Sequence, residues 1–353
     1  MDMTRRQFAS DNYAGMCPEV LDALIRANSG HCIPYGEDEY TARACNMLRE
    51  FFAADCEVFF VFNGTAANSL ALASLCQSYH SIICHQYAHI ETDECGAPEF
   101  FSNGTKILIA GGINGKLSPR EVEEVAGKRT DIHYPKPRVI SITQATEVGT
   151  VYSVEEVREL GALAKRLDLR FHMDGARLAN ALAALDVAPE ELTWKAGLDV
   201  LCLGGVKNGI SAGEAVVFFN RQLAHEFDYR CKQAGQLASK MRFLSAPWIG
   251  LLSNDTWKKN ALHANRCARV LHEGLSAVEG IRVMFPVEAN SVFVEMTHAM
   301  ISGLHDMGWR FYTFIGEGGV RLMCSWDTTD QDVEYFIGDV KKLSKMPGKD
   351  DMR

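Results

Sequence analysis

Three features that would narrow the class of this protein at once are missing from its sequence: paired cysteines, a long apolar run and a concentration of positive charge. Its eleven cysteines include no C-x-x-C pair, so they fit neither a disulfide framework nor a zinc-ligand array. No stretch approaches the roughly 18 apolar residues that span a bilayer, and residues 1–12 lack the apolar run of a signal peptide. We therefore expect a cytoplasmic protein with no membrane partner, whose cysteines are mostly buried and reduced.

The charged residues argue against a nucleic-acid partner. There are 36 lysines and arginines against 45 acidic residues, a formal charge of −9, and the basic residues are scattered. Nucleic-acid binding normally needs them gathered into a patch or stripe. A G-x-G-x-x-G turn after a strand is also absent, which argues against a dinucleotide enzyme.

The length and the hydrophobic pattern predict an α/β protein of about two domains. The 353 residues are enough for two cores, and short β-branched or aromatic runs alternate with helical patterns, which favours a mainly parallel sheet. The predicted strands are residues 57–62, 81–85, 106–110, 138–143, 169–174 and 199–203. The predicted helices are residues 66–75, 118–127 and 153–167, the last two opening with Ser-x-x-Glu, the pattern of a capping box.

From about residue 250 the pattern changes. Residues 257–278 fit one long amphipathic helix, and residues 291–296 a short strand. We therefore predict a large domain over residues 1–250 and a smaller C-terminal α+β domain over residues 251–353.

Two junctions in the predicted large domain carry side chains suited to chemistry. In "LDVLCLGGVKNGISAGEAVVFF", Lys207 follows a buried strand and is flanked by glycines that let the backbone turn sharply. In "FHMDGARLANAL", Asp174 ends another strand. If the two strands are parallel, Asp174 and Lys207 emerge at the carboxyl edge of the sheet, where open α/β sheets bind ligands.

A third junction could bind an anion. Gly64 and Thr65 follow a strand and open a helix, so their amides and the Thr65 hydroxyl form a potential phosphate site. A lysine, an acid and an anion cradle at one edge are the parts needed for pyridoxal phosphate: the lysine can form a Schiff base, and the acid can keep the pyridine nitrogen protonated. Arg177 could then bind an amino-acid carboxylate. Taken alone, a solvated loop lysine and a surface pair between Asp174 and Arg177 explain the same residues.

The chain as a whole resembles a known family. The segments "FASDNYAG", "YGEDEYTARA", "FNGTAANSLAL", "AHIETDECGAPEF", "HMDGAR" and "GGVKNG" occur in the order and spacing of the low-specificity L-threonine aldolases. This resemblance implies pyridoxal 5'-phosphate as the cofactor. It also implies the aspartate aminotransferase-like fold type I: a large domain with a mainly parallel sheet, and a smaller C-terminal α+β domain.

The resemblance also implies roles for particular residues. His89 matches a histidine that stacks on the cofactor ring, and His133 matches one placed near the substrate's β-hydroxyl. Ser10 and Arg321, together with Arg177, match positions that hold the substrate carboxylate.

Two further matches imply an active site shared between subunits. Tyr35 and Arg242 correspond to positions contributed by a neighbouring subunit, with the arginine reaching the cofactor phosphate. Family members are usually tetramers, so we expect at least a homodimer and most simply a homotetramer.

The expected reaction is reversible cleavage of L-threonine, L-allo-threonine and related β-hydroxy-α-amino acids, phenylserine among them, to glycine and an aldehyde. His133 or His89 would handle the hydroxyl proton. The alternatives are another pyridoxal-phosphate β-eliminating lyase or dehydratase, a metal enzyme using His172 and Asp174, and a non-catalytic protein of the same fold.

Three departures from the family pattern matter. Val206 stands where many relatives have a serine or threonine that helps to bind phosphate, which predicts weaker cofactor binding. Residues 144–146 read Gln-Ala-Thr where several relatives have Glu-Asn-Thr, so a proton-transfer role for that glutamate does not carry over. "NGT" replaces the family's "TGT", a small change because the amides do most of the anion binding.

Overall fold

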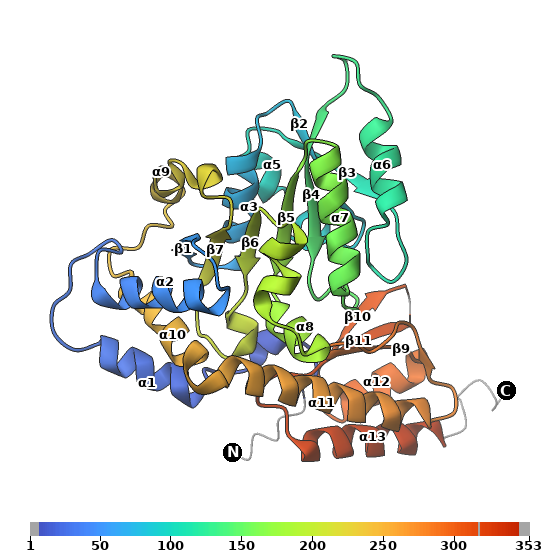
Figure 1. Ribbon diagram of the computed structural model, residues 1–353. Coiled ribbons are helices and arrows are strands. Elements are labelled where there is room, and N and C mark those ends of the chain that lie inside the picture. Colours follow the sequence, from blue (N-terminus) through green and yellow to red (C-terminus); the bar gives the residue numbers. More distant parts are fainter. Residues whose placement is uncertain (1–6, 317, 346–353) are drawn as a thin grey trace.

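The computed structural model describes residues 7–316 and 318–345, and a seven-stranded sheet forms its centre (Figure 1). In order across the sheet, the strands are β1 (Glu57–Val61), β7 (Glu214–Phe218), β6 (Val200–Leu203), β5 (Arg170–Gly175), β4 (Lys136–Thr143), β2 (His80–His85) and β3 (Lys106–Ala110). The strands from β6 to β3 are parallel, and β7 is antiparallel to both neighbours. The prediction of a mainly parallel sheet is confirmed. Strand β7 reverses because residues 204–213 are too few for the crossover that a parallel pair requires.

Helices cover both faces of this sheet, as Figure 1 shows. The helices of the chain are α1 (Pro18–Ala27), α2 (Glu39–Phe51), α3 (Gly64–Leu75), α4 (His89–Thr92), α5 (Ala97–Phe101), α6 (Pro119–Gly127), α7 (Val154–Arg166), α8 (Leu178–Leu185), α9 (Phe227–Gln233), α10 (Arg242–Leu252), α11 (Thr256–Ser276), α12 (His298–Asp306) and α13 (Asp330–Ser344). Helices α7 and α8 share one core cluster with the sheet, whereas α3 and α9 share another. The sheet is therefore buried on both sides, which explains its nearly continuous apolar strands.

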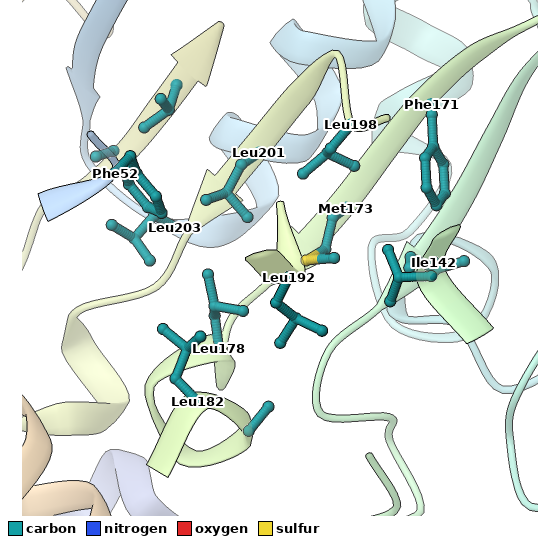
Figure 2. Packing of buried hydrophobic residues seen from close by; sticks show 14 of the residues in the cluster. Phe52, Ile142, Phe171, Met173, Leu178, Leu182, Leu192, Leu198, Leu201 and Leu203 are labelled. Carbon is teal, nitrogen blue, oxygen red and sulfur yellow. The ribbon is translucent and has the colours of Figure 1, made fainter. Parts of the chain in front are cut away.

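Alternation along β5 determines which side chains reach the ligand-binding face. Phe171 and Met173 pack on the side of α8, with Leu178 and Leu182 (Figure 2). Each such buried side chain contributes roughly 1.5–3 kcal/mol to stability. Because successive strand residues point to opposite faces, Asp174 lies on the other face, where Asn68 of α3 contacts it.

A second sheet lies near the C-terminus. It has the order β10 (Tyr312–Ile315), β11 (Gly319–Met323), β9 (Ser291–Glu295) and β8 (Arg282–Val283), all antiparallel. The predicted boundary near residue 250 falls within α10. The predicted domains also include residues 1–6 and 346–353, which lie outside the described residues.

The first described residues join this second unit. Phe8 packs between Trp309 and Phe336, with ring centroids 5.8 and 5.1 Å away. Gln7 forms a parallel bridge with Arg310. The chain then continues into Ser10 and the short helix η1 (Asp11–Tyr13). Packing of Phe8 against the C-terminal unit therefore positions these residues at the edge of the large sheet.

Only one of the two predicted capping boxes forms. At α7, the Glu156 amide donates to Ser153 Oγ and the Ser153 amide donates to Glu156 Oε2. At α6, the Ser118 side chain makes no capping hydrogen bond. The Ser118 amide already donates to the carbonyl of Gly111, so the expected partner for a returning glutamate is engaged.

The structure agrees with the sequence on the cysteines and on the lack of long apolar segments. All eleven cysteines are free, and eight are buried. Within residues 7–316 and 318–345, every helix is too short or too polar to cross a membrane.

Candidate active site

A cavity of about 340 Å³ opens at the carboxyl edge of the large sheet, beside the second sheet. It is lined by Ser10, Asn12, Tyr87, His89, Thr92, Asp93, Glu147, Arg177, Lys207, Phe314, Ile315 and Arg321. Five of the predicted site residues are therefore in one place, although they are far apart in the sequence. The set includes two arginines and a lysine, which suits an anionic ligand.

A rigid turn presents Lys207. The Gly204 amide donates to the carbonyl of Gly175 across the strand ends, 3.0 Å away. The Gly205 amide donates to Glu214 Oε2 at 2.5 Å, and Gly209 closes the turn with a φ of 107°, a conformation that favours glycine. The buried carboxylate of Glu214 therefore fixes the backbone of the turn that carries Lys207.

Glu214 itself is electrostatically unusual. Burial raises its pKa from 4.5 to about 7, although the hydrogen bond from Gly205 and the charge of Lys207 act in the opposite direction. The sequence pattern did not predict a role for this acid, because it reads as the first residue of an apolar strand.

A chain of hydrogen bonds joins Asp174 to His89. Asn68 Nδ2 donates to Asp174 Oδ2 at 2.9 Å and to Glu94 Oε1 at 2.8 Å. The same Glu94 oxygen lies 2.8 Å from His89 Nδ1. Burial alone would lower the pKa of His89, but the hydrogen bond to Glu94 and the charges of Asp174 and Glu147 outweigh it and raise that pKa. The network favours a charged imidazole and fixes its ring.

Arg177 forms a buried ion pair rather than a surface one. Its Nε and Nη2 atoms donate to Asp11 Oδ2 and Oδ1 at 2.8 and 3.1 Å, and its side chain is 5% exposed. Asn290 also donates to Asp11. Burial would raise the pKa of Asp11, but Arg177 holds it below its ordinary value. The alternative of a surface pair between Asp174 and Arg177 is therefore wrong.

One edge of Arg177 remains available to a ligand. Asp11 occupies Nε and Nη2, whereas Nη1 lies 3.8 Å from Glu147 Oε2 at the cavity wall. Asp11 thus orients the guanidinium without using all of its donors.

Arg321 supplies a second cation. Its guanidinium lies over the rings of Tyr312 and Phe314, 5.7 and 4.8 Å from their centroids. Its Nη2 donates to the carbonyl of Ala9 at 3.4 Å. Burial and the charge of Arg177 lower the pKa of Arg321, which a bound carboxylate would reverse.

The residues Gly64 and Thr65 begin α3 as predicted. Asn63 caps the helix by accepting a hydrogen bond from the Ala66 amide at 2.9 Å. The first amides of a helix have no carbonyl partner within it, and the space beside Gly64 is open for at least 4 Å. This end of α3 can accept a phosphate.

The donor set fits pyridoxal phosphate. A lysine amine, a buried carboxylate, an oriented imidazole and an open helix N-terminus match the aldehyde, pyridine nitrogen, ring and phosphate of that group. Asp174 is 5% exposed, so its charge would act on a ring nitrogen with little screening by water.

A metal site built on His172 and Asp174 does not fit. His172 is fully buried, with Nδ1 2.9 Å from Ser141 Oγ and Nε2 3.2 Å from Cys202 Sγ. Both ring nitrogens are therefore engaged in the core. His89, Glu94 and Asp174 do place possible ligand atoms within 4.8 Å of one another, but the hydrogen bonds described above already link them.

Two predicted residues lie on another part of this subunit. Tyr35 is in the loop between α1 and α2, where its amide donates to the carbonyl of Ser239 at 3.1 Å. Arg242 begins α10 and donates to the carbonyl of Gly30 at 3.5 Å. Neither lines the cavity of its own chain.

His133 is also separate from the cavity. It lies exposed in the turn before β4, where its amide donates to Asp131 Oδ1 at 3.0 Å. This turn is at the amino end of β4, next to a different cavity of about 780 Å³. Figure 1 shows the segment between α6 and β4 at the opposite end of the sheet from β10 and β11.

Comparison with known proteins extends over nearly the whole chain. A family model described as beta-eliminating lyase matches residues 7–299. The chain is 61% identical to the low specificity L-threonine aldolase of Pseudomonas sp. (strain NCIMB 10558), over 96% of this chain and 98% of the relative. It is also 61% identical to the enzyme of that name from Pseudomonas aeruginosa, over 95% and 97% of the two chains. The structure of Leishmania major threonine aldolase superimposes with a TM-score of 0.90 at 30% identity, covering 96% of this chain and 99% of the other.

Proposed function

Because the chain belongs to the beta-eliminating lyase family, we propose that it is a pyridoxal-phosphate-dependent low-specificity L-threonine aldolase. It cleaves L-threonine, L-allo-threonine and related β-hydroxy-α-amino acids reversibly to glycine and an aldehyde. The 61% identity to two aldolases of this kind over nearly the full chain supports the assignment. The observation that carries it is the presence of Lys207, His89 and Arg177 around one cavity, with Asp174 linked to His89 through Asn68 and Glu94.

Five residues would hold the cofactor at the sheet edge. Lys207 would bind the aldehyde carbon, and Asp174 would hold a proton on the pyridine nitrogen. The amides of Gly64 and Thr65 would bind the phosphate, and His89 would cover the ring in the orientation set by its hydrogen bond to Glu94. When bound, pyridoxal phosphate accepts the electron pair that the substrate's Cα–Cβ bond releases.

The substrate carboxylate would meet Ser10, Arg177 and Arg321. Ser10 is fixed because its hydroxyl oxygen accepts from the Asn12 amide at 3.1 Å, and Asp11 orients Arg177. Two cations in a partly enclosed cavity bind a carboxylate far more strongly than they would in water.

We further propose that the active site is shared between subunits of a cytoplasmic homotetramer. Support comes from Tyr35, Arg242 and His133, which match the family pattern but lie away from the cavity of their own chain. They can serve a cavity only by reaching that of another copy. The eleven free thiols support a reducing compartment.

The first test is product analysis. Purified protein with added pyridoxal phosphate should release equimolar acetaldehyde and glycine from L-threonine, and Lys207→Ala should release neither. Ammonia with a keto acid would instead identify a dehydratase or another β-eliminating lyase. Release of benzaldehyde from phenylserine would extend the substrate range.

A second test addresses the shared site. Lys207→Ala and Arg242→Ala should each be inactive alone. Subunit exchange between them should restore activity, because some cavities would then combine Lys207 from one subunit with Arg242 from its neighbour. No recovery in mixtures whose exchange is verified by mass spectrometry would contradict a shared site.

A further inference from the structure

Glu147 is an acid at the cavity wall that neither the sequence pattern nor the family resemblance assigned. Its side chain is 8% exposed. One oxygen, Oε2, lies 3.8 Å from Arg177 Nη1, and the other, Oε1, is buried without a hydrogen-bond partner among the described residues. Burying a carboxylate oxygen without a hydrogen-bond partner is unfavourable, so the position of Oε1 calls for an explanation.

The loop that carries Glu147 is held firmly. The Thr146 amide donates to the carbonyl of Thr150 at 2.9 Å, and the two threonine hydroxyls are 2.7 Å apart. Gly149 has a φ of 82° and packs against Ser291 of the second sheet. Glu147 is therefore held at the wall by hydrogen bonds within its own loop and by the contact of that loop with the second sheet.

With a substrate bound, the two arginines of the cavity have partners of opposite charge, so Glu147 can accept a hydrogen bond from an uncharged donor. Asp11 already forms two hydrogen bonds with Arg177. A substrate carboxylate adds a negative charge, which the remaining edge of Arg177 and Arg321 can bind. The Oε1 atom of Glu147 then needs an uncharged hydrogen-bond donor, and the β-hydroxyl group is the donor that distinguishes the substrates of the proposed function.

Within the subunit that forms the cavity, other groups are less suited to receive a proton from that hydroxyl. His133 of the same chain lies outside the cavity, in the turn with Asp131. His89 is held at Nδ1 by Glu94, in the orientation in which it would cover the cofactor ring in the proposed function. Gln144, in the position where relatives have glutamate, is bound through its side-chain amide to the backbone of Tyr152 at 2.8 and 3.0 Å. Asp93 also lines the cavity, but its side chain is 83% exposed.

We propose that Glu147 is a catalytic residue that removes the proton from the substrate's β-hydroxyl group. The electron pair of the O–H bond becomes the second bond of the aldehyde carbonyl, and the Cα–Cβ bond breaks. Bound pyridoxal phosphate would supply the electron sink for the pair that this bond releases, and Cα gains a proton to give glycine. The proton taken by Glu147 balances the proton gained by Cα. This inference rests on the proposed function.

The decisive variant is Glu147→Gln, which keeps the size of the side chain and removes its basicity. The turnover number for L-threonine cleavage should fall about 100-fold or more, the contribution typical of a general base. Exchange of the glycine α-hydrogen with deuterated water should stay within about threefold of wild type, because glycine has no β-hydroxyl. Glu288→Gln is the control: this exposed acid holds the same loop from outside by accepting from the Val151 amide at 2.6 Å, and its loss should leave cleavage within about twofold.

An equilibrium measurement separates binding from proton transfer. Wild type should bind L-serine more tightly than L-alanine in rapid titrations of the cofactor's visible absorption. Glu147→Gln should keep this preference to within about fivefold, and Glu147→Leu should reduce it about tenfold or more, the effect of losing a hydrogen bond to a charged group.

The outcomes are distinct. A wild-type protein that does not cleave β-hydroxy amino acids refutes the proposed function itself. If wild type cleaves and Glu147→Gln does so equally well, the proposed role of Glu147 is wrong. Equal loss of cleavage and glycine exchange in Glu147→Gln also overturns it, because the residue would then act on the site as a whole rather than on the hydroxyl.

Discussion

Replacing Glu214 with glutamine should change how the stability of the protein depends on pH. Burial raises the pKa of this acid from 4.5 to about 7 in the folded protein. The folded protein therefore keeps a proton that the unfolded chain releases, and the free energy of unfolding falls as pH rises through this window. At about 1.4 kcal/mol for each pKa unit, the loss is about 3 kcal/mol between pH 4.5 and 7.

Glu214→Gln removes this titration without removing the contact. The amide oxygen can still accept from Gly205, as the carboxylate does at 2.5 Å. Unfolding of cofactor-free protein by denaturant, at pH 5 and pH 8 and one protein concentration, should show a pH-dependent loss about 3 kcal/mol smaller in the variant. Glu334→Gln, at an exposed position on α13, should match wild type. If Glu214→Gln and wild type lose the same free energy between the two pH values, the inference that Glu214 is protonated in the folded protein fails.

Three further predictions concern the site and its support. Arg177→Lys should raise the KM for L-threonine about 10–100-fold, with a smaller effect on the turnover number. A lysine cannot both keep the two hydrogen bonds to Asp11 and bind a carboxylate. Steady-state kinetics would measure both constants. Glu94→Gln should move the titration of His89 to lower pH, because a charge that favours the imidazolium is lost, and an NMR titration of the ring that stays in place would contradict this. Gly204→Ala should lower the melting temperature, because the added Cβ atom would lie 2.5 Å from the carbonyl oxygen of Ala176. The expected loss in the free energy of unfolding is about 1–3 kcal/mol or more. An unchanged thermal denaturation curve would count against this packing.

The sequence was most informative where local rules apply. Strand residues followed by glycine turns placed Asp174 and Lys207 at one edge, because parallel strands end at the same side of a sheet. Sequence spacing suggested Asp174 as the alternative partner of Arg177, whereas the structure pairs Arg177 with Asp11, 166 positions away. Such a partner can be found only when the second sheet's packing is known.

Three acids around the cavity escaped sequence reasoning for the same physical reason. Glu94 lies in a short connection after α4, Glu147 in a loop after β4, and Glu214 at the start of a buried strand. Their importance comes from burial and from partners on other elements, and no local pattern encodes either. His133 shows the reverse case: the family pattern identified it, but its place at the amino end of β4 leaves a role to be tested in another subunit.

The packing of Phe8 against Trp309 and Phe336 also bears on how the enzyme is made. On the ribosome, the last strand of the large sheet, Glu214–Phe218, emerges well before Trp309 and Phe336. Until those two residues have been synthesised, Phe8 has no partners to pack against. Asp11 is then not held in position to pair with Arg177. The proposed active-site cavity is therefore completed at the end of synthesis, after long-range contacts between the two ends of the chain have formed. A product of premature termination would contain the lysine and the sheet but would lack the ordered substrate pocket.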